Sequence, residues 1–287
     1  KDIFRTYFGS LSITRKFGKN TKLSLSAAAF HTNEQEKYDI QGQYWLTQTE
    51  TSENLGVGTY MEHARNYLEA TVKSAKLTFN HKTKKHDIEA GLTYKIESIK
   101  ENSKEYEMRD SSGYSIPHTG EDLYMIYSLN ARNSLDANRI EAYAQDTWRF
   151  TSRGGHTFFT LNYGIRFSHW NFNKESIISP RVSLGIIPAF NHDVTLRFAT
   201  GIYYQAPFFK ELRDTTTVNG ITYATRNRDI KSQRSIHFIA GFDYRFKMKN
   251  RPYKFTAEAY YKALSNIIPY TVDNVKIVYD ASLQCSG

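Results

Sequence analysis

The sequence predicts an all-β protein, an antiparallel transmembrane β-barrel wall of about ten strands, and three observations carry this prediction. Apolar and polar residues alternate with a period of two over most of the chain, which is the pattern of strands with two unlike faces. The alternating runs are mostly about 10 to 15 residues long, whereas strands of soluble proteins cluster near five or six. Short and long connections alternate, as in barrels with short periplasmic turns and long outer loops.

The clearest hairpin lies in 179–214. Leu184 and Ile186 share one face of its first strand, and Leu196 and Phe198 share one face of the second, while the opposite faces carry Arg, Thr, Ser and Gly. In a membrane barrel the apolar face contacts lipid and the polar face lines the interior. We therefore expect lipid, and not a shared protein interior, around Leu196, Phe238 and Phe255.

The same alternation places the other strands in order. Strands are expected at 1–15, 22–33, 67–81, 86–101, 139–151, 156–170, 179–187, 194–204, 231–247 and 253–262. A change of parity between Val72 and Ala75 predicts a bulge in the third strand. Short turns are expected near residues 18, 84, 154, 192 and 250, and long polar loops at 34–62, 102–136 and 214–226. The first strand would then run towards the periplasm, and the chain would end on the extracellular side.

Composition agrees with this class and excludes others. Tyr and Phe number 21 and 18, and no run approaches the roughly 18 apolar residues of a membrane-spanning helix. The net charge is +9, but the basic residues are spread through the strands, which argues against nucleic-acid binding and fits attraction to anionic lipopolysaccharide or an anionic ligand. The single Cys285 excludes an internal disulfide and a cysteine-ligated zinc site.

Several motifs resemble a known family. Their order is Ser-Pro-Arg at 179–181, Gly-Ile-Tyr-Tyr-Gln-Ala-Pro at 201–207 and Glu-Leu-Arg at 211–213. Together they resemble the barrel of TonB-dependent outer-membrane receptors. The motifs at 258–262, 266–270 and 273–275 resemble the sub-branch of these receptors with a carboxypeptidase-regulatory-like N-terminal domain.

The resemblance implies a barrel of 22 strands around a folded plug. Residues 1–287 are then expected to be part of one outer-membrane β-barrel domain, incomplete at both ends and without the plug. The implied partners are outer-membrane lipid and lipopolysaccharide, the plug domain and remaining strands of the same protein, the TonB complex through the missing N-terminal part, and a surface lipoprotein.

Charged residues on the polar faces are the first candidate site. A charge at these positions would be costly if it faced lipid, so we expect all of them to face the lumen. They either pair with one another and the plug, or guide an anionic ligand. These candidates are Arg166, Arg181, Arg197, Asp243, Arg245 and Glu258.

A second candidate site is the extracellular lip after the strand at 194–204. Its aromatic residues either form an interfacial girdle or stack on a sugar or peptide substrate. Glu211 matches a Glu of the family, and the sequence assigns it no role. The lip candidates are Tyr203, Tyr204, Phe208, Phe209 and Glu211.

The leading hypothesis is the barrel portion of a TonB-dependent receptor that takes up a scarce nutrient. No nucleophile motif, metal-binding pair or cofactor fingerprint is present, so we expect no enzyme activity, metal or cofactor. The alternatives are a passive porin-like outer-membrane barrel and a soluble β-sandwich adhesin or carbohydrate-binding module. The sequence does not indicate the ligand.

Overall fold

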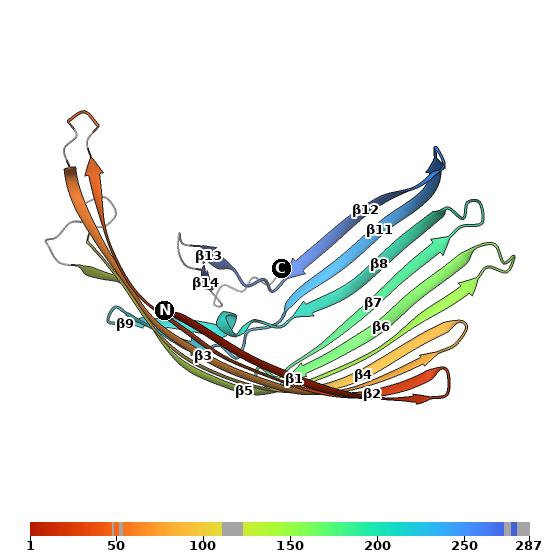
Figure 1. Ribbon diagram of the computed structural model, residues 1–287, viewed down its shortest axis with the longest axis horizontal. Helices are drawn as coiled ribbons and strands as arrows, with labels where there is room; N and C mark the ends of the chain where they lie inside the picture. The colour runs from red at the N-terminus through yellow and green to blue at the C-terminus, as the bar shows by residue number, and fades with distance from the viewer. Residues whose placement is uncertain (48, 52–53, 111–122, 273–276, 280–287) are drawn as a thin grey trace.

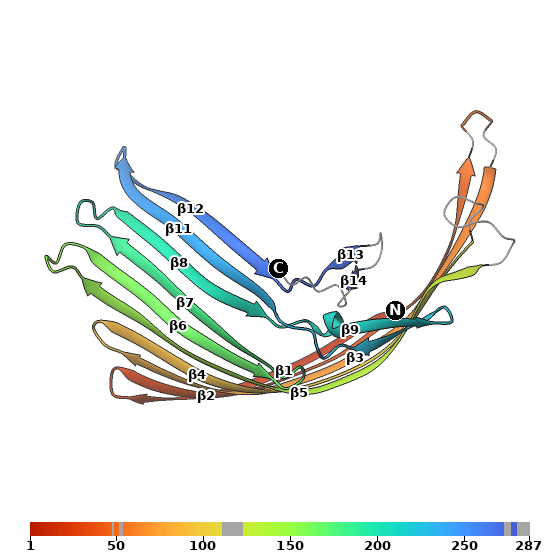
Figure 2. The ribbon, with the colours of Figure 1, turned by 180° about the vertical axis from the view of Figure 1, so that it is seen from behind.

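The computed structural model describes residues 1–47, 49–51, 54–110, 123–272 and 277–279. It is an all-β fold in which one antiparallel sheet curves into a trough (Figure 1, Figure 2). The motif at 273–275 and Cys285 lie outside the described residues.

Ten strands form the wall of the trough in chain order, interrupted only by a hairpin that leaves the path between the eighth and ninth strands. The wall strands are β1 (Asp2–Phe17), β2 (Thr21–Thr47), β3 (Asn54–Lys82), β4 (His86–Asp110), β5 (Tyr124–Thr151), β6 (Phe158–Trp170), β7 (Glu175–Ile187), β8 (Val194–Gln205), β11 (Gln233–Met248) and β12 (Arg251–Ser265). The remaining elements are the 3₁₀ helix η1 (Phe209–Leu212), the hairpin β9 (Arg213–Val218) and β10 (Ile221–Arg226), and the pair β13 (Tyr270–Val272) and β14 (Ile277–Tyr279).

Neighbouring wall strands pair antiparallel, and the predicted fold class and wall of ten strands are confirmed. The five short turns, at 18–20, 83–85, 152–157, 188–193 and 249–250, lie together along one edge of the sheet, here named the short-turn edge (Figure 1). β1 and β12 are the two ends of the strand order, so the sheet is open within the described residues. No helix among the described residues is both long and apolar enough to cross a bilayer.

The convex face of the trough carries the large apolar side chains. Phe238 and Phe255 are each 53% exposed, and Leu196 is half-buried on the same face. These three side chains do not gather in a protein interior, and so the sandwich alternative does not fit: a sandwich would bury such a face against a second sheet. A continuous apolar face on long strands is what a wall against lipid requires.

Two of the predicted long loops are mostly strand. Most of 34–62 belongs to β2 and β3, and the described part of 102–136 belongs largely to β4 and β5. These strands have 25 to 29 residues, but about 10 suffice to cross the hydrocarbon layer. The extra length extends beyond the other strands at the end opposite the short-turn edge (Figure 2). The lipid-facing alternation is lost there although the backbone pairing continues, and buried apolar residues such as Leu129 and Leu135 lie on the concave face. The third predicted loop, 214–226, is the hairpin β9–β10.

The predicted bulge between Val72 and Ala75 is wrong. The register of β3 is unbroken there: Val72 pairs with Phe30 and Glu97, and Ala75 pairs with Ala27 and Tyr94. The apolar residues change face because the strand leaves the lipid belt. Towards the short-turn edge they lie on the convex face, and further out they lie on the concave face.

Candidate functional site

The hairpin β9–β10 folds onto the concave face and is the main feature of the candidate site. β10 adds to the wall by pairing in parallel with β5, with Thr222 opposite Leu129 and Ala224 opposite Ala131. Asn133 of β5 donates its side-chain amide to the backbone carbonyl of Ala224 over 3.2 Å. The loop that follows β8 is therefore held inside the trough.

The entry to this hairpin is fixed by Glu211. The Glu211 Oε2 atom accepts a hydrogen bond of 2.7 Å from the backbone N–H of Phe208, the residue before η1. This bond satisfies a backbone donor at the start of η1, which is the work of a capping side chain. The structure thus gives Glu211 a local role that the sequence did not indicate.

The next residue, Leu212, joins the hairpin to the protein core. Its side chain is fully buried and belongs to an apolar cluster on the concave face. The cluster unites residues from β5, the β6–β7 region, the hairpin and the loop after β12: Leu135, Ala137, Trp170, Phe172, Leu212, Ile230 and Ile268. Burial of a leucine side chain contributes about 2 kcal/mol, so this contact holds the hairpin more firmly than a single surface hydrogen bond.

Buried polar contacts surround the same cluster. Ser232 is 1% exposed, and its backbone N–H and hydroxyl both donate to the carboxylate of Glu175, the hydroxyl over 2.5 Å. Asn173 donates to the backbone carbonyl of Ile230 over 2.9 Å. Residues 230–232, which follow the hairpin β9–β10, are thus hydrogen-bonded to Asn173 and to Glu175 at the start of β7.

All six predicted lumen residues lie on the concave face. Arg197 Nη2 lies 3.1 Å from Asp243 Oδ1 and 3.8 Å from Glu258 Oε2, which brings these three together. Arg245 is exposed near the short-turn edge. Arg166 and Arg181 lie on β6 and β7, away from the Arg197 group. Their placement agrees with the expected orientation, and their part in guiding a ligand stays a prediction.

The predicted lip residues divide between two faces. Tyr203 lies on the concave face, where its ring stacks on His237 with 4.5 Å between ring centres. Tyr204 follows it on the strand and therefore points to the convex face, as an interfacial girdle residue would. Phe208 is 63% exposed, whereas Phe209 packs against the apolar cluster. Tyr203 and Phe209 therefore do not lie where an interfacial girdle on the convex face would place them.

An acidic strip runs along the concave face beyond the lipid belt. Its carboxylates come from β2, β3 and β4, and those of Glu62, Glu101 and Glu107 are buried. Burial, followed by the repulsion of nearby glutamates, raises the pKa of the Tyr38 phenol to about 12. No group of three or more His, Cys, Asp or Glu in the described part of the chain could hold a metal ion.

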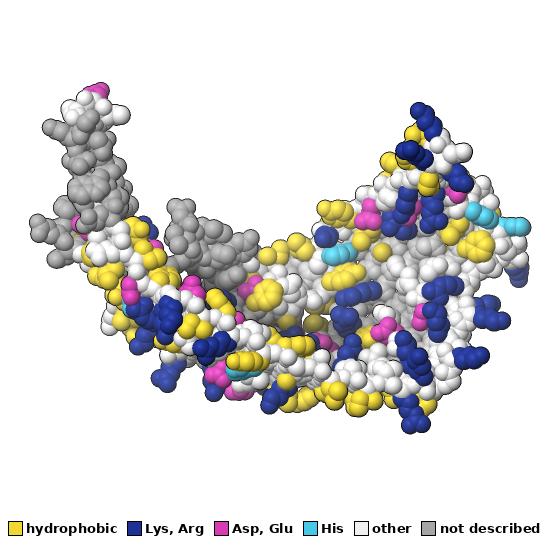
Figure 3. Space-filling view, viewed as in Figure 1, with side chains coloured by type: hydrophobic (Ala, Val, Ile, Leu, Met, Phe, Trp, Pro, Cys, Tyr) yellow, Lys and Arg dark blue, Asp and Glu magenta, His cyan; other side chains and the backbone are white. Residues whose placement is uncertain are grey.

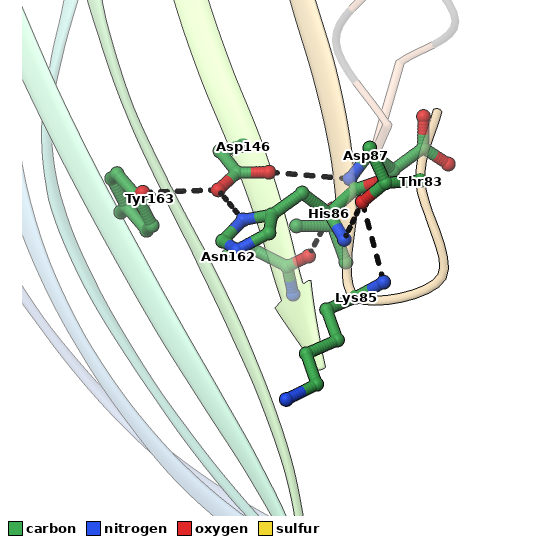
Figure 4. A network of polar contacts seen from close by, with 8 residues as sticks. Thr83, Lys85, His86, Asp87, Asp146, Asn162 and Tyr163 are labelled. Carbon is green, nitrogen blue, oxygen red and sulfur yellow. Dashed lines mark hydrogen bonds and ion pairs between the residues drawn. The ribbon is translucent and has the colours of Figure 1, made fainter. Parts of the chain in front are cut away.

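One polar cluster on the convex face was not anticipated. Asp146 of β5 is 8% exposed and lies between two strands' side chains (Figure 4). Its carboxylate contacts His86 Nδ1 at 2.7 Å and accepts hydrogen bonds from the Tyr163 hydroxyl over 3.0 Å and the Asp87 backbone N–H over 3.2 Å. A carboxylate near lipid is tolerated only when its oxygens are bonded. The one feature of the sequence that could have indicated this cluster is Asp146 itself, an acidic residue on the apolar face of its strand two positions before Trp148.

Basic side chains concentrate at the opposite end from the acidic strip. Lys and Arg gather along the short-turn edge (Figure 3), where the turns and their flanks include Lys19, Lys84, Lys85, Arg153 and Lys249. The two ends of the wall therefore differ in charge. The apolar belt lies near the basic end.

A match to a known protein family agrees with this fold. Residues 2–281 match the family described as TonB dependent receptor-like, beta-barrel. No curated protein matches the sequence. Among solved structures, the RagAB peptide transporter aligns at 11% identity and a TM-score of 0.47, over 98% of this chain and 33% of that chain.

Two further structures come from Pseudomonas aeruginosa. A mutant of the ferric enterobactin receptor PfeA aligns at 12% identity and a TM-score of 0.40, over 99% of this chain and 46% of that chain. The siderophore receptor PirA aligns at 10% identity and a TM-score of 0.40, over 96% of this chain and 56% of that chain. The chain thus spans about a third to just over half of these proteins. On the family match over residues 2–281, the chain belongs to the TonB-dependent receptor-like β-barrel family.

Proposed function

We propose that this chain is the barrel portion of a TonB-dependent receptor of the bacterial outer membrane, and that the whole protein imports a scarce nutrient with energy relayed through TonB. The family match over residues 2–281 is the observation that carries this proposal. The work is binding and passage without covalent chemistry, and it needs no resident cofactor.

The concave face supports a role in controlled passage. The hairpin β9–β10 lies within the trough and is anchored by Leu212 and by its pairing with β5. Such a segment narrows the interior on the side away from the short-turn edge, which is the extracellular side if the short turns are periplasmic. A ligand arriving from outside would meet the hairpin, the acidic strip and exposed Phe208.

Binding to TonB tests the proposal without knowledge of the nutrient. The purified full-length protein in detergent is expected to bind the periplasmic domain of TonB on a sensor surface, and removal of the N-terminal segment of the full-length protein should abolish that binding. Absence of binding by the intact protein would contradict energised uptake.

A passive porin-like barrel is the second candidate, and membrane conductance separates the two. A plugged receptor reconstituted in a planar bilayer is expected to show no steady open channel. A porin-like barrel would conduct continuously and would not respond to TonB.

The partners follow from the same proposal. We propose contact with lipopolysaccharide around the convex belt, with a plug domain inside the barrel, and with a surface lipoprotein over the extracellular side. Copurification of a lipoprotein with the tagged full-length protein from native outer membranes tests the last of these. Recovery of the receptor alone, under conditions that preserve its plug, would count against a stable lipoprotein partner.

A further inference from the structure

Two arginines on the concave wall lack the carboxylate partner that their neighbour has. Arg197 has Asp243 at 3.1 Å and Glu258 at 3.8 Å. Among the described residues, no ion pair within 4.0 Å involves Arg166 or Arg181. The guanidinium donors of Arg166 and Arg181 are therefore not taken up by a carboxylate of the described residues.

The two arginines border one hollow. It has a volume of about 370 Å³ and lies between β5 and β8. Arg166 is opposite Ser179, and Arg181 is opposite Gly164, which makes the two arginines diagonal neighbours on adjacent strands. Diagonal neighbours have their Cα atoms about 7–8 Å apart, and both arginines line the hollow, with Arg166 on the β5 side over Tyr143 and Arg181 on the β8 side over Tyr203. The concave lining also includes Tyr143, Asn162, Gly164, Ser183, Ala199 and Tyr203.

Arg181 is held in place before any ligand arrives. Its guanidinium carbon lies 4.2 Å from the centre of the Tyr203 ring, and that ring stacks in turn on His237. The stem of Arg181 crosses Gly201, where a Cβ atom would come within 3.0 Å of Arg181 Cγ. The Nε atom is buried without a hydrogen-bond acceptor. The stacked side chain is therefore positioned, and part of its hydrogen-bonding capacity is unused.

The surroundings of Arg166 are also cationic. Arg166 and Lys76 both lie over the ring of Tyr143, at 6.0 and 5.7 Å from its centre. The nearby acids are already engaged. Glu89 accepts hydrogen bonds from Tyr143 and Gln145. A second acid, Glu141, lies 3.0 Å from the ammonium group of Lys95. Asp146 also lines the hollow, and its carboxylate is bonded to His86, the Tyr163 hydroxyl and the Asp87 backbone N–H. The acids beside the two arginines are thus all engaged by other groups, and the field of the arginines favours an anion.

We propose that Arg166 and Arg181 form a carboxylate-binding site in the lumen wall. The planar guanidinium fork matches the two oxygens of a carboxylate, and the hydroxyl and amide groups of the hollow can bond the remaining lone pairs. The carboxylate comes either from a solute within the lumen or from an acidic side chain elsewhere in the same protein. The site depends on the wall geometry, and it holds whether or not transport is energised.

Succinate binding to the purified full-length protein in detergent tests the site, with calorimetry as the readout. If the carboxylate comes from a solute, succinate binds, and Arg166→Gln or Arg181→Gln weakens it about tenfold, as expected for loss of a charge-assisted hydrogen bond. Arg181→Lys keeps the charge but loses the fork, and is expected to weaken binding as well. Arg153→Gln, at an exposed position of a short turn outside the hollow, should leave succinate affinity unchanged.

If the carboxylate belongs to the protein itself, succinate finds the site filled, and the thermal midpoint becomes the readout. Arg166→Gln should then lower the midpoint, although this side chain is exposed. Without any bound carboxylate, removing one of two neighbouring cations relieves repulsion and leaves the midpoint unchanged or higher. Two outcomes would overturn the site. One is an unchanged or higher midpoint of Arg166→Gln together with no succinate binding by the wild type. The other is equal succinate binding by the wild type and both glutamine variants. Arg166→Gln keeps the test valid if Arg181→Gln does not fold.

Discussion

Arg213 at the start of β9 forms an ion pair with Glu101 of β4, a residue 112 positions earlier in the chain. The Glu101 side chain is only 3% exposed, and it also accepts a hydrogen bond of 3.2 Å from Asn133. This pair links the inward hairpin to the middle of the wall. The two residues could not be matched from the sequence, because Arg213 lies in the Glu-Leu-Arg motif and Glu101 ends a predicted strand, and neither position indicates the other.

Arg213→Gln is expected to destabilise the hairpin by about 3 kcal/mol, since it leaves a buried carboxylate without its counter-ion. Limited proteolysis of the full-length protein should show faster cleavage within 213–226, while the wall strands stay protected. Arg153→Gln, an exposed residue of a short turn, is the matched control and should cleave like wild type. Unchanged protection in the Arg213 variant would show that the ion pair does not hold the hairpin.

Leu212→Ala tests the apolar anchor of the same hairpin. The side chain is fully buried, and truncation of a buried leucine costs about 2–5 kcal/mol. Hydrogen exchange of residues 209–226 should become faster, with β6 and β7 little affected. Ile221→Ala lies in the same hairpin but is 38% exposed, so its effect should stay near 0.5 kcal/mol. Equal effects of the two variants would argue that burial is not what holds the hairpin.

Phe255→Arg tests which face meets lipid. Phe255 is 53% exposed on the convex face of β12, and an arginine turned to lipid costs from about 1 kcal/mol near the interface to about 2–4 kcal/mol at the bilayer midplane. Folding of the full-length protein into lipid vesicles, followed by denaturant titration, should show this loss. Tyr260→Arg, on the concave face of the same strand and 70% exposed, should fold with nearly wild-type stability. The opposite ranking would reverse the assignment of the two faces.

The contacts of Asp39 with Arg65 and His63 are expected to make the pairing of the extended parts of β2 and β3 sensitive to acid. A hydrogen bond from Arg65, and a second contact with His63, lower the pKa of the Asp39 carboxyl below its ordinary value of 3.8. An acid with a lowered pKa contributes stability that is complete above the ordinary value and is lost as the pH falls through the folded value. Gln41 and Met61 face each other across β2 and β3. The distribution of distances between spin labels at these two positions should therefore broaden below about pH 4.

Asp39→Asn is the control for this acid response. The amide cannot titrate, so the label distance should be the same on both sides of that pH range. An equal acid response in the variant and the wild type would assign the opening to other groups.

Sequence alternation was sufficient to predict the wall. Leu196, Phe238 and Phe255 were expected on one side of their strands, and they lie on the convex face with Arg197 opposite them. A side-chain period of two is a local property of an extended backbone, so it can be recognised without knowing which strand pairs with which. It failed at 34–62 and 102–136 because the strands there extend beyond the lipid belt and need no apolar convex face, whereas buried residues such as Leu135 lie on the concave face.

The positions of the charges on the inner wall were predictable for the same reason, but their partners were not. Nothing local distinguishes Arg197, which pairs with Asp243, from Arg181, which stacks on Tyr203. Pairing depends on strand register and on which side chains meet across neighbouring strands.

The sequence by itself determined the strands, their two faces and the family. Only the tertiary structure decided that the segment 209–226 folds inward, that Glu211 caps its first turn, and that Arg166 and Arg181 share a hollow. The physical reason is that alternation is written into neighbouring residues, whereas a buried contact depends on groups such as Glu101 and Arg213, which come together only when distant strands are aligned.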